Sequence, residues 1–238
     1  MEKVNTGIKG FDEILGGGLP RESNILIVGG PGTGKTMFCL QYLYKGAYDY
    51  NEPGIYISLE EREKDLKRNV ESFGWDLDSL INQGKLEIMD VSTTLVDEYE
   101  GSDISLRVID IGSLINIIFE RVKSLKAQRV AIDSIPTLFL QYDNLSSVRN
   151  NIFRLCNLLL TIGCTTLLCS QAGIGQIGKF GIEEYIAQGV IVLNLQRSGD
   201  KLVRSLYVRK MRGCDHSMYV HPFEITPEEG IVLEKIIR

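Results

Sequence analysis

Long apolar runs are missing from this sequence, since none reaches the roughly 18 residues that a membrane-spanning helix requires. The opening residues, MEKVNTG, lack the features of a secretory signal. The five cysteines include no CxxC pair, and the two histidines do not flank them at the spacing of metal ligands. We therefore expect a soluble, cytoplasmic protein with reduced thiols, without a zinc site and without a membrane partner.

Positive charge is also scarce, because 26 lysines and arginines face 31 aspartates and glutamates, which gives a net charge of −5. This balance argues against a general nucleic-acid or membrane-surface binder, although it allows a local basic strip. The charged fraction of 24% is ordinary, and 44% of the 238 residues are hydrophobic, so the chain can bury a substantial core. We expect one large α/β domain over residues 1–238 rather than two small ones.

Short apolar segments alternate with longer amphipathic ones as far as residue 171. The apolar runs predict strands at 24–30, 54–60, 85–90, 129–134 and 164–171, and helical spacing predicts helices at 37–50, 62–75, 111–127 and 146–162. The polar, acidic segment 91–110 is expected to be irregular. Alternation of this kind, with nearly continuous apolar strands, is typical of a mainly parallel sheet covered by helices on both faces.

The pattern changes towards the C-terminus, where strand-like segments follow one another directly. These segments are 189–197, 202–211 and 218–226, and only short turns separate them. Short turns between strands favour antiparallel hairpins. We expect these hairpins to extend the sheet at one edge.

A glycine-rich stretch, GGPGTGKT at 29–36, has the spacing G-x-x-x-x-G-K-[ST] of a phosphate-binding loop. It follows a predicted strand and opens a predicted helix, which a chance glycine-rich turn would rarely do. Glycines let backbone N–H groups turn towards phosphate oxygens, and the helix N-terminus adds positive potential. The residues predicted to bind the nucleotide here are Gly30, Pro31, Gly32, Thr33, Gly34, Lys35, Thr36 and Met37. Lys35 would reach the β- and γ-phosphates.

A magnesium ion at such a site needs a ligand from the loop and a carboxylate from a strand end. Thr36 supplies a hydroxyl, and RVAIDS supplies Asp133 after three apolar residues. A strand otherwise rarely ends in a buried, unpaired charge, because that charge is costly. Asp110 is a weaker candidate, since its surroundings are more polar. We predict that Thr36 and Asp133 bind Mg²⁺ together with ATP or ADP.

Two adjacent glutamates, Glu60 and Glu61, follow the second predicted strand. They lie at the carboxyl edge of the sheet, where ligands bind in open α/β folds. A carboxylate at this place can orient and activate the water that attacks a phosphate. The pair can instead cap the following helix, whose dipole favours negative charge. Both roles stay open, and one glutamate can serve each.

Together these residues resemble a KaiC-type domain of the RecA/RadA superfamily of ATPases. The likeness begins with VNTGIKGFDEILGGGLPRESNILIVGGPGTGKT, includes the paired glutamates and VAIDS, and closes with KMRGCDHSMYVHPFEIT, over about residues 6–225. It implies a RecA-like P-loop fold, ATP hydrolysis with Mg²⁺, and a homohexameric ring with ATP between subunits. One of the paired glutamates would then activate water. Gln171 would sense the γ-phosphate, although it can equally be a polar residue that finishes a strand.

The cations Lys210 and Arg212 match the family's K-x-R pair, which reaches the γ-phosphate held by the adjacent subunit. In a strand, side chains two residues apart share a face, so Arg209 between them points the other way. Cations on an edge hairpin, far in sequence from their own phosphate loop, are suited to act in trans as an arginine finger does. The alternative is a solvated strand face with a surface ion pair.

The family's two-domain clock members phosphorylate themselves on a neighbouring Ser and Thr, which here match Glu184 and Tyr185. Because the hydroxyl acceptors are absent apart from Tyr185, the resemblance favours the hydrolytic type of domain. The first functional hypothesis is a slow ATPase that acts as a regulatory switch or motor on an unidentified protein partner.

Two other functions are compatible with the same resemblance. A RadA-like DNA recombination or repair accessory protein would contact DNA through 136–146 and 173–185. The first of these segments has no cation and the second has Lys179 and Phe180 against two glutamates, so a positive groove is poorly supported. A non-hydrolysing ATP sensor is the third hypothesis, and the paired glutamates argue against it.

Overall fold

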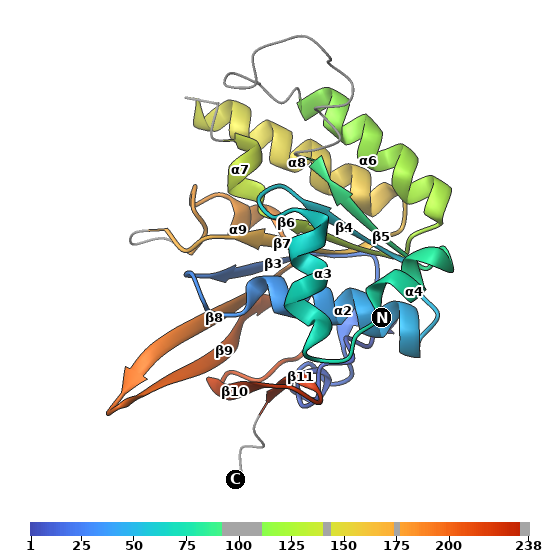
Figure 1. Ribbon diagram of the computed structural model, residues 1–238. Helices are drawn as coiled ribbons and strands as arrows, with labels where there is room; N and C mark the ends of the chain where they lie inside the picture. Colours follow the sequence, from blue (N-terminus) through green and yellow to red (C-terminus); the bar gives the residue numbers. More distant parts are fainter. Residues whose placement is uncertain (92–110, 140–143, 174–176, 234–238) are drawn as a thin grey trace, which may run out of the picture.

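A nine-stranded sheet runs through the centre of the protein (Figure 1). The computed structural model describes residues 1–91, 111–139, 144–173 and 177–233. The strands of this sheet are β3 (Asn24–Gly29), β4 (Gly54–Ser58), β5 (Leu86–Asp90), β6 (Arg129–Asp133), β7 (Thr165–Ser170), β8 (Gly189–Ser198), β9 (Lys201–Met211), β10 (His221–Thr226) and β11 (Gly230–Leu233). Their order is β11-β10-β9-β8-β3-β7-β6-β4-β5. A separate antiparallel pair consists of β1 (Lys3–Val4) and β2 (Leu19–Pro20).

Six neighbouring strands, from β8 through β3 to β5, are parallel. Every residue of β3, β4, β6 and β7 is buried, as expected for parallel strands covered on both faces. The carboxyl ends of these four strands meet at one edge, which brings together Gly29, Ser58, Asp133 and Ser170. The predicted α/β fold with a mainly parallel sheet is confirmed.

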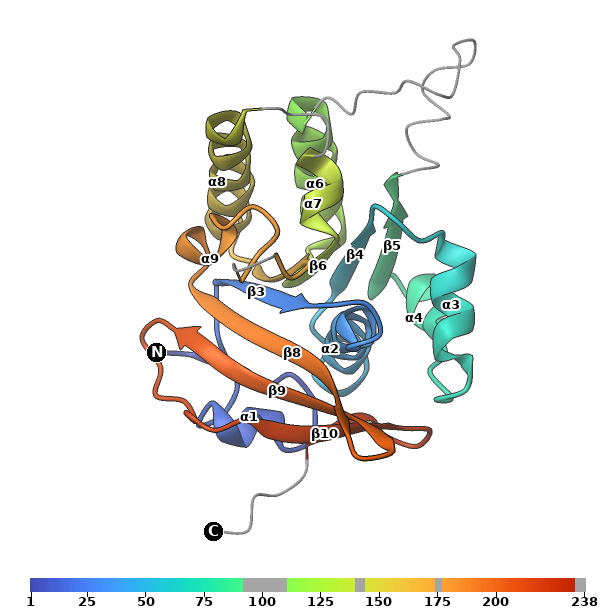
Figure 2. The same ribbon diagram turned by 90° about the vertical axis from the view of Figure 1, so that its left-hand side faces the viewer.

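Helices cover both faces of the sheet (Figure 2). They are α1 (Phe11–Ile14), α2 (Lys35–Asp49), α3 (Glu63–Glu71), α4 (Leu77–Asn82), α6 (Ile111–Leu125), α7 (Ile135–Phe139), α8 (Leu145–Thr161) and α9 (Glu183–Ile186). One apolar cluster contains α1 to α4, and a second on the opposite face contains α6, α7 and α8. Among the described helices, none has both the length and the apolar character needed to cross a bilayer.

The predicted helix 62–75 is shorter in the structure. α3 ends at Glu71, and the chain brings Trp75 into the core before α4 begins. Gly74 lies between them with φ 68°, a left-handed conformation that glycine adopts without steric cost and that ends helices. The predicted irregular segment falls almost wholly on 92–110, which lies outside the described residues.

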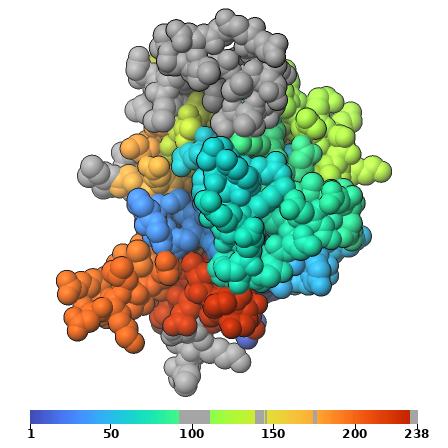
Figure 3. Space-filling model, in the orientation of Figure 1, coloured from blue at the N-terminus to red at the C-terminus, as the bar shows by residue number. Residues whose placement is uncertain are grey.

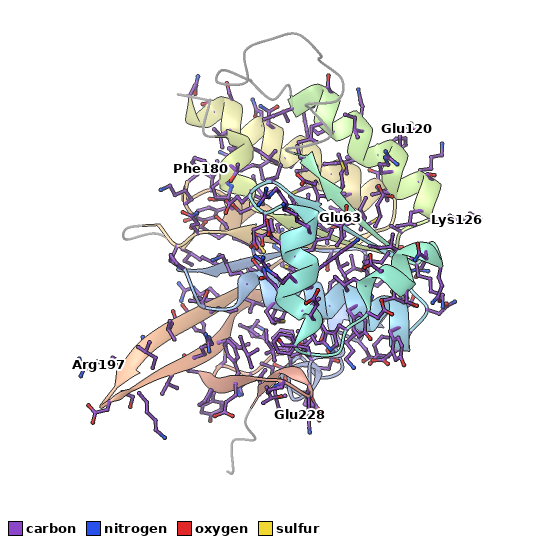
Figure 4. The ribbon with its side chains drawn as sticks, in the orientation of Figure 1. Glu63, Glu120, Lys126, Phe180, Arg197 and Glu228 are labelled. Carbon is purple, nitrogen blue, oxygen red and sulfur yellow. The ribbon has the colours of Figure 1, made fainter. Side chains whose placement is uncertain are left out.

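The C-terminal strands form the antiparallel edge that the sequence predicts. β8 pairs with β9, β9 with β10, and β10 with β11, a strand that was not expected. β8 also pairs in parallel with β3, so it joins the two parts of the sheet. The β8–β9 hairpin projects from the body (Figure 3), and Arg197 marks its outer end (Figure 4).

Candidate functional site

The glycine-rich loop connects the end of β3 to the first residue of α2. Gly32 and Gly34 have φ values of 74° and 104°, which side-chain-bearing residues adopt only under strain. Thr33 Oγ1 donates to Gly30 O over 2.8 Å and closes the turn. Pro31 and Gly32 are exposed at the outside of the loop. The loop therefore has the conformation that its glycines predict.

Lys35 lies at the mouth of this loop, where its Nζ donates to Gly29 O over 2.9 Å and to Gly30 O over 3.1 Å. α2 begins at the same residue without a side-chain cap, so its first N–H groups face the loop. Met37, also predicted to contact the nucleotide, is partly buried and packs against the core. Loop, lysine and helix N-terminus together form a cradle for an anion.

The C-terminal hairpins pack against the outside of the same loop. Arg204 Nε, from β9, donates to Gly32 O over 3.1 Å. A Cβ on Gly29 would lie 2.8 Å from Leu193 O, and one on Gly34 would lie 3.3 Å from Ile225 Cδ1. The sequence analysis missed Arg204, because its neighbours in the sequence give no hint that β9 passes the phosphate loop.

Asp133 ends β6 beside the start of α2, as predicted. Thr36 Oγ1 donates to Asp133 Oδ2 over 2.7 Å, and Tyr56 Oη donates to the same oxygen over 2.8 Å. Burial and the charge of Asp133 raise the pKa of Tyr56, so the phenol remains a donor. Tyr56 was not predicted, since it lies within an apolar strand run.

This hydroxyl and carboxylate suit a magnesium ion. Mg²⁺ is usually bound by one or two carboxylates, substrate phosphates and water, and not by an all-protein cage. Thr36 and Asp133 meet within 2.7 Å next to the phosphate loop and supply that small set of hard oxygen ligands. The described residues hold no group of three or more His, Cys, Asp or Glu placed to bind a metal.

Glu60 and Glu61 follow β4 and point to different partners. Glu60 Oε1 accepts hydrogen bonds from Ser134 Oγ and, over 2.6 Å, from Thr137 Oγ1. Glu61 Oε2 accepts from Asn69 Nδ2 over 3.0 Å. Burial raises the pKa of Glu61, and the negative charge of Asp133 raises it further.

The helix-capping alternative for these glutamates is not seen. α3 begins at Glu63 after Arg62, and no side chain caps it. Glu60 instead accepts hydrogen bonds from residues that follow Asp133, so its carboxylate lies at the carboxyl edge of the sheet beside Asp133. Glu61 contacts α3 through Asn69, and the charge of Asp133 acts on it.

Gln171 follows β7 at the same carboxyl edge and is exposed. Its neighbour Ser170 is buried and donates from Oγ to Glu183 Oε1 over 3.1 Å. Glu183 has a relative exposure of 1%, which makes it a buried carboxylate that the sequence analysis did not identify. The DNA-contact alternative involves 136–146 and 173–185, of which 140–143 and 174–176 lie outside the described residues.

Lys210 and Arg212 lie towards the amino ends of the parallel strands, whereas the phosphate loop follows the carboxyl end of β3. Lys210 pairs with Val190, which pairs with Leu26, three residues before Gly29. At a rise of about 3.3 Å per residue and about 4.8 Å per strand, Lys210 is about 10 Å along and about 10 Å across from Gly29. The pair is therefore remote from its own phosphate loop in space as well as in sequence.

Both cations reach the same short segment. Lys210 Nζ donates to Glu184 O over 2.7 Å, and Arg212 Nη2 donates to Tyr185 O over 3.5 Å. β9 ends at Met211, so Arg212 lies in the turn beyond the strand. The pairing of β8 with β9 also shifts register between Val190 and Ile191. Burial and the positive charge of Arg212 lower the pKa of Lys210.

The arrangement belongs to the RecA-like class of P-loop nucleotide-binding proteins. A family model described as the ATPase KaiC matches residues 4–236. A crystal structure of a KaiC-like protein from Pyrococcus horikoshii superposes with a TM-score of 0.86 at 40% sequence identity, covering 98% of this chain and 99% of that chain. The chain belongs to the KaiC family of ATPases.

Two kinds of relative match this chain. A UPF0273 protein of Methanocaldococcus jannaschii is 39% identical over 247 residues, which cover 100% of this chain and 99% of that protein. The circadian clock oscillator protein KaiC of Synechococcus elongatus is 39% identical over 233 residues, which cover 97% of this chain and 44% of that protein. This chain thus spans less than half the length of the clock protein. Membership of the KaiC family supports nucleotide binding by this chain. The circadian role belongs to the clock protein and is not transferred to this chain.

Proposed function

We propose that this protein binds Mg-ATP and hydrolyses it at a site that a neighbouring copy of the chain completes with Lys210 and Arg212. The observation that carries the proposal is the position of these two cations towards the amino ends of the parallel strands, away from the phosphate loop at their carboxyl ends. A cation pair that cannot reach its own nucleotide is suited to stabilise charge on the nucleotide of the next subunit.

The phosphate loop and Lys35 bind the β- and γ-phosphates of ATP in this proposal. Thr36 and Asp133 would hold Mg²⁺, which would supply positive charge to the phosphate oxygens. Tyr56 keeps the Asp133 carboxylate in position through its hydrogen bond. Gln171, at the end of β7, reports the presence of the γ-phosphate.

The paired glutamates Glu60 and Glu61 supply the carboxylate that accepts a proton from the attacking water. The γ-phosphorus–oxygen bond to ADP breaks as the water oxygen bonds to phosphorus, and the products are ADP and phosphate. Thr137 holds Glu60 beside Asp133 through a hydrogen bond. The pKa of Glu61 is raised, and a carboxylate with a raised pKa is a stronger base.

The assembly in this proposal is a homo-oligomeric ring, with six subunits expected from the family resemblance. Residues 1–238 act as a single ATPase domain. Slow turnover makes the lifetime of each nucleotide state long, and this suits a regulatory switch or a motor that acts on a partner protein.

The test is steady-state ATP hydrolysis per subunit over a wide range of protein concentration, with Mg²⁺. A specific activity that rises and saturates is expected, because dilution separates the two halves of the site. Arg212→Ala should keep ATP binding and lower kcat about 10³-fold or more, as loss of an arginine finger does. Arg209→Ala, on the exposed neighbouring residue, is the matched control and should leave kcat unchanged.

Two results would refute the proposal. Normal turnover by Arg212→Ala would remove the trans role from this residue. Absence of turnover by the wild-type protein at every concentration would favour the sensor hypothesis.

A further inference from the structure

A buried carboxylate links the end of β7, next to Gln171, to the segment that the two cations contact. Glu183 Oε1 accepts from Ser170 Oγ over 3.1 Å, and Ser170 directly precedes Gln171. The side chains of Glu183 and Ser170 are buried, at 1% and 0% relative exposure. Phe180, labelled in Figure 4, donates its N–H to both oxygens of Glu183, and Ile182 N donates to Oε2 over 3.2 Å.

These bonds use the acceptor capacity of both carboxylate oxygens and fix the start of α9 against the end of β7. A Cβ on Gly178 would lie 2.7 Å from Glu183 Oε2, so the chain before α9 also closes tightly over this group. Burying a carboxylate is costly unless donors surround it, and here one hydroxyl and two backbone N–H groups do so.

The far end of the same segment holds the cations. Glu183 O accepts from Ala187 N over 3.0 Å, and Gln188 O accepts from Arg212 N over 2.9 Å. The side chains of Lys210 and Arg212 donate to the carbonyl groups of residues 184 and 185. A shift of α9 would therefore move the points that both cations contact.

We propose that Glu183 is a positioning residue that ties the phosphate-sensing strand end of one subunit to the cations which that subunit presents to its neighbour. This inference rests on the proposed trans action of Lys210 and Arg212 and adds a regulation to it. Nucleotide bound in one subunit then affects hydrolysis in the next through Ser170, Glu183 and α9.

The test uses two defective chains that complement each other. Lys35→Ala subunits cannot bind ATP but present intact cations, whereas Arg212→Ala subunits bind ATP but present a defective pair. Co-expressed, they should assemble and regain hydrolysis at sites with an intact loop and intact cations. Glu183→Gln is then added to one parent at a time, because a carboxamide has only one accepting oxygen where the carboxylate has two.

The expected outcome is asymmetric. Glu183→Gln in the Lys35→Ala parent should lower hydrolysis between about tenfold and 100-fold, as a misplacement of about 1 Å can do. The same change in the Arg212→Ala parent should have little effect. Equal losses from both parents, loss only from the Arg212→Ala parent, or no loss would each overturn the proposal.

Controls distinguish the positioning role of Glu183 from the trans action of Lys210 and Arg212 on which it rests. If the Arg212→Ala parent is complemented neither by the Lys35→Ala parent nor by a Glu60→Gln/Glu61→Gln parent, which binds ATP but lacks the base, trans completion is refuted and the positioning role falls with it. Glu224→Gln, on an exposed residue of β10, should change neither mixture. Should Glu183→Gln fail to fold, Ser170→Ala removes the same link from the other side and Ser170→Thr should restore it, with the same asymmetry expected.

Discussion

At the scale of single residues, each acidic side chain of the site is held by a neutral donor. Tyr56 Oη binds Asp133, Thr137 Oγ1 binds Glu60, and Asn69 Nδ2 binds Glu61. Such donors fix the direction of a carboxylate and leave its charge in place. Substitutions that keep the shape of a side chain but remove its charge can therefore separate the two contributions.

The variants Glu60→Gln and Glu61→Gln apply this to the proposed base. Each retains an oxygen that can accept the hydrogen bond from Thr137 or Asn69, so a loss of rate reports the missing charge. We expect the variant that removes the base to lower kcat about 10²–10⁴-fold while ATP affinity remains near the wild-type value. Single-turnover hydrolysis and direct nucleotide binding measure the two quantities. Glu71→Gln, on an exposed residue of α3, is the control.

The pH dependence identifies the base independently. A base must be deprotonated, so activity is present above its pKa and is lost as the pH falls through it. Because burial and Asp133 raise the pKa of Glu61, a Glu61 base places the acid limb of kcat above the usual glutamate range. Wild-type rates in both glutamine variants would contradict a carboxylate base at this edge.

At the scale of elements, β6 has a charged residue at each end, the proposed magnesium ligand Asp133 at one and Arg129 at the other. Arg129, which begins the strand, has a relative exposure of 1%. Its Nε donates to Glu52 Oε2 over 2.7 Å, and its other nitrogens donate to Tyr42 O and Asn5 O over 2.9 and 2.8 Å. This arginine connects the N-terminal segment, α2 and the start of the sheet.

Arg129→Met should destabilise the protein by about 3–5 kcal/mol, because it leaves buried acceptors and part of the Glu52 charge without a partner. Urea unfolding, followed by circular dichroism, measures the change in free energy of unfolding. Arg121→Met provides the comparison, since the Arg121–Glu87 pair is more exposed and should contribute at most about 1 kcal/mol. Equal unfolding midpoints for the two variants would show that the buried arginine is not a structural link.

The sequence predicts those parts of the site that local patterns encode, and it does not predict contacts between residues far apart in the chain. The phosphate loop and the strand that ends in Asp133 are local patterns, and the structure places both at one edge of the sheet. Tyr56, Arg204 and Glu183 bind partners that lie 77, 172 and 13 positions away in the chain. No sequence motif with a fixed spacing indicates these contacts. The predicted roles of the site residues stay predictions that the variants above test.

At the scale of the whole molecule, nucleotide bound between two chains should favour their association. A ligand that binds the assembled state and not the separated chains stabilises the assembly according to its concentration. In sedimentation of dilute protein, Mg-ATP should shift the population to larger species, and EDTA should reverse the shift. Lys35→Ala, which cannot bind ATP, should show neither response. A nucleotide-independent size in the wild-type protein at every dilution would contradict an interface closed by ATP.

The separation of the phosphate loop from the cation pair also limits the symmetry of any assembly. Each chain would meet one neighbour with its loop and another with its cations, which is a heterologous, head-to-tail contact. A two-fold dimer would complete its sites only if the loop and the cations lay on one self-complementary patch, because an isologous contact pairs each group with its counterpart on the other chain. Successive heterologous contacts either close into a ring or continue as an open helical filament. The rotation between neighbouring chains decides between those two forms.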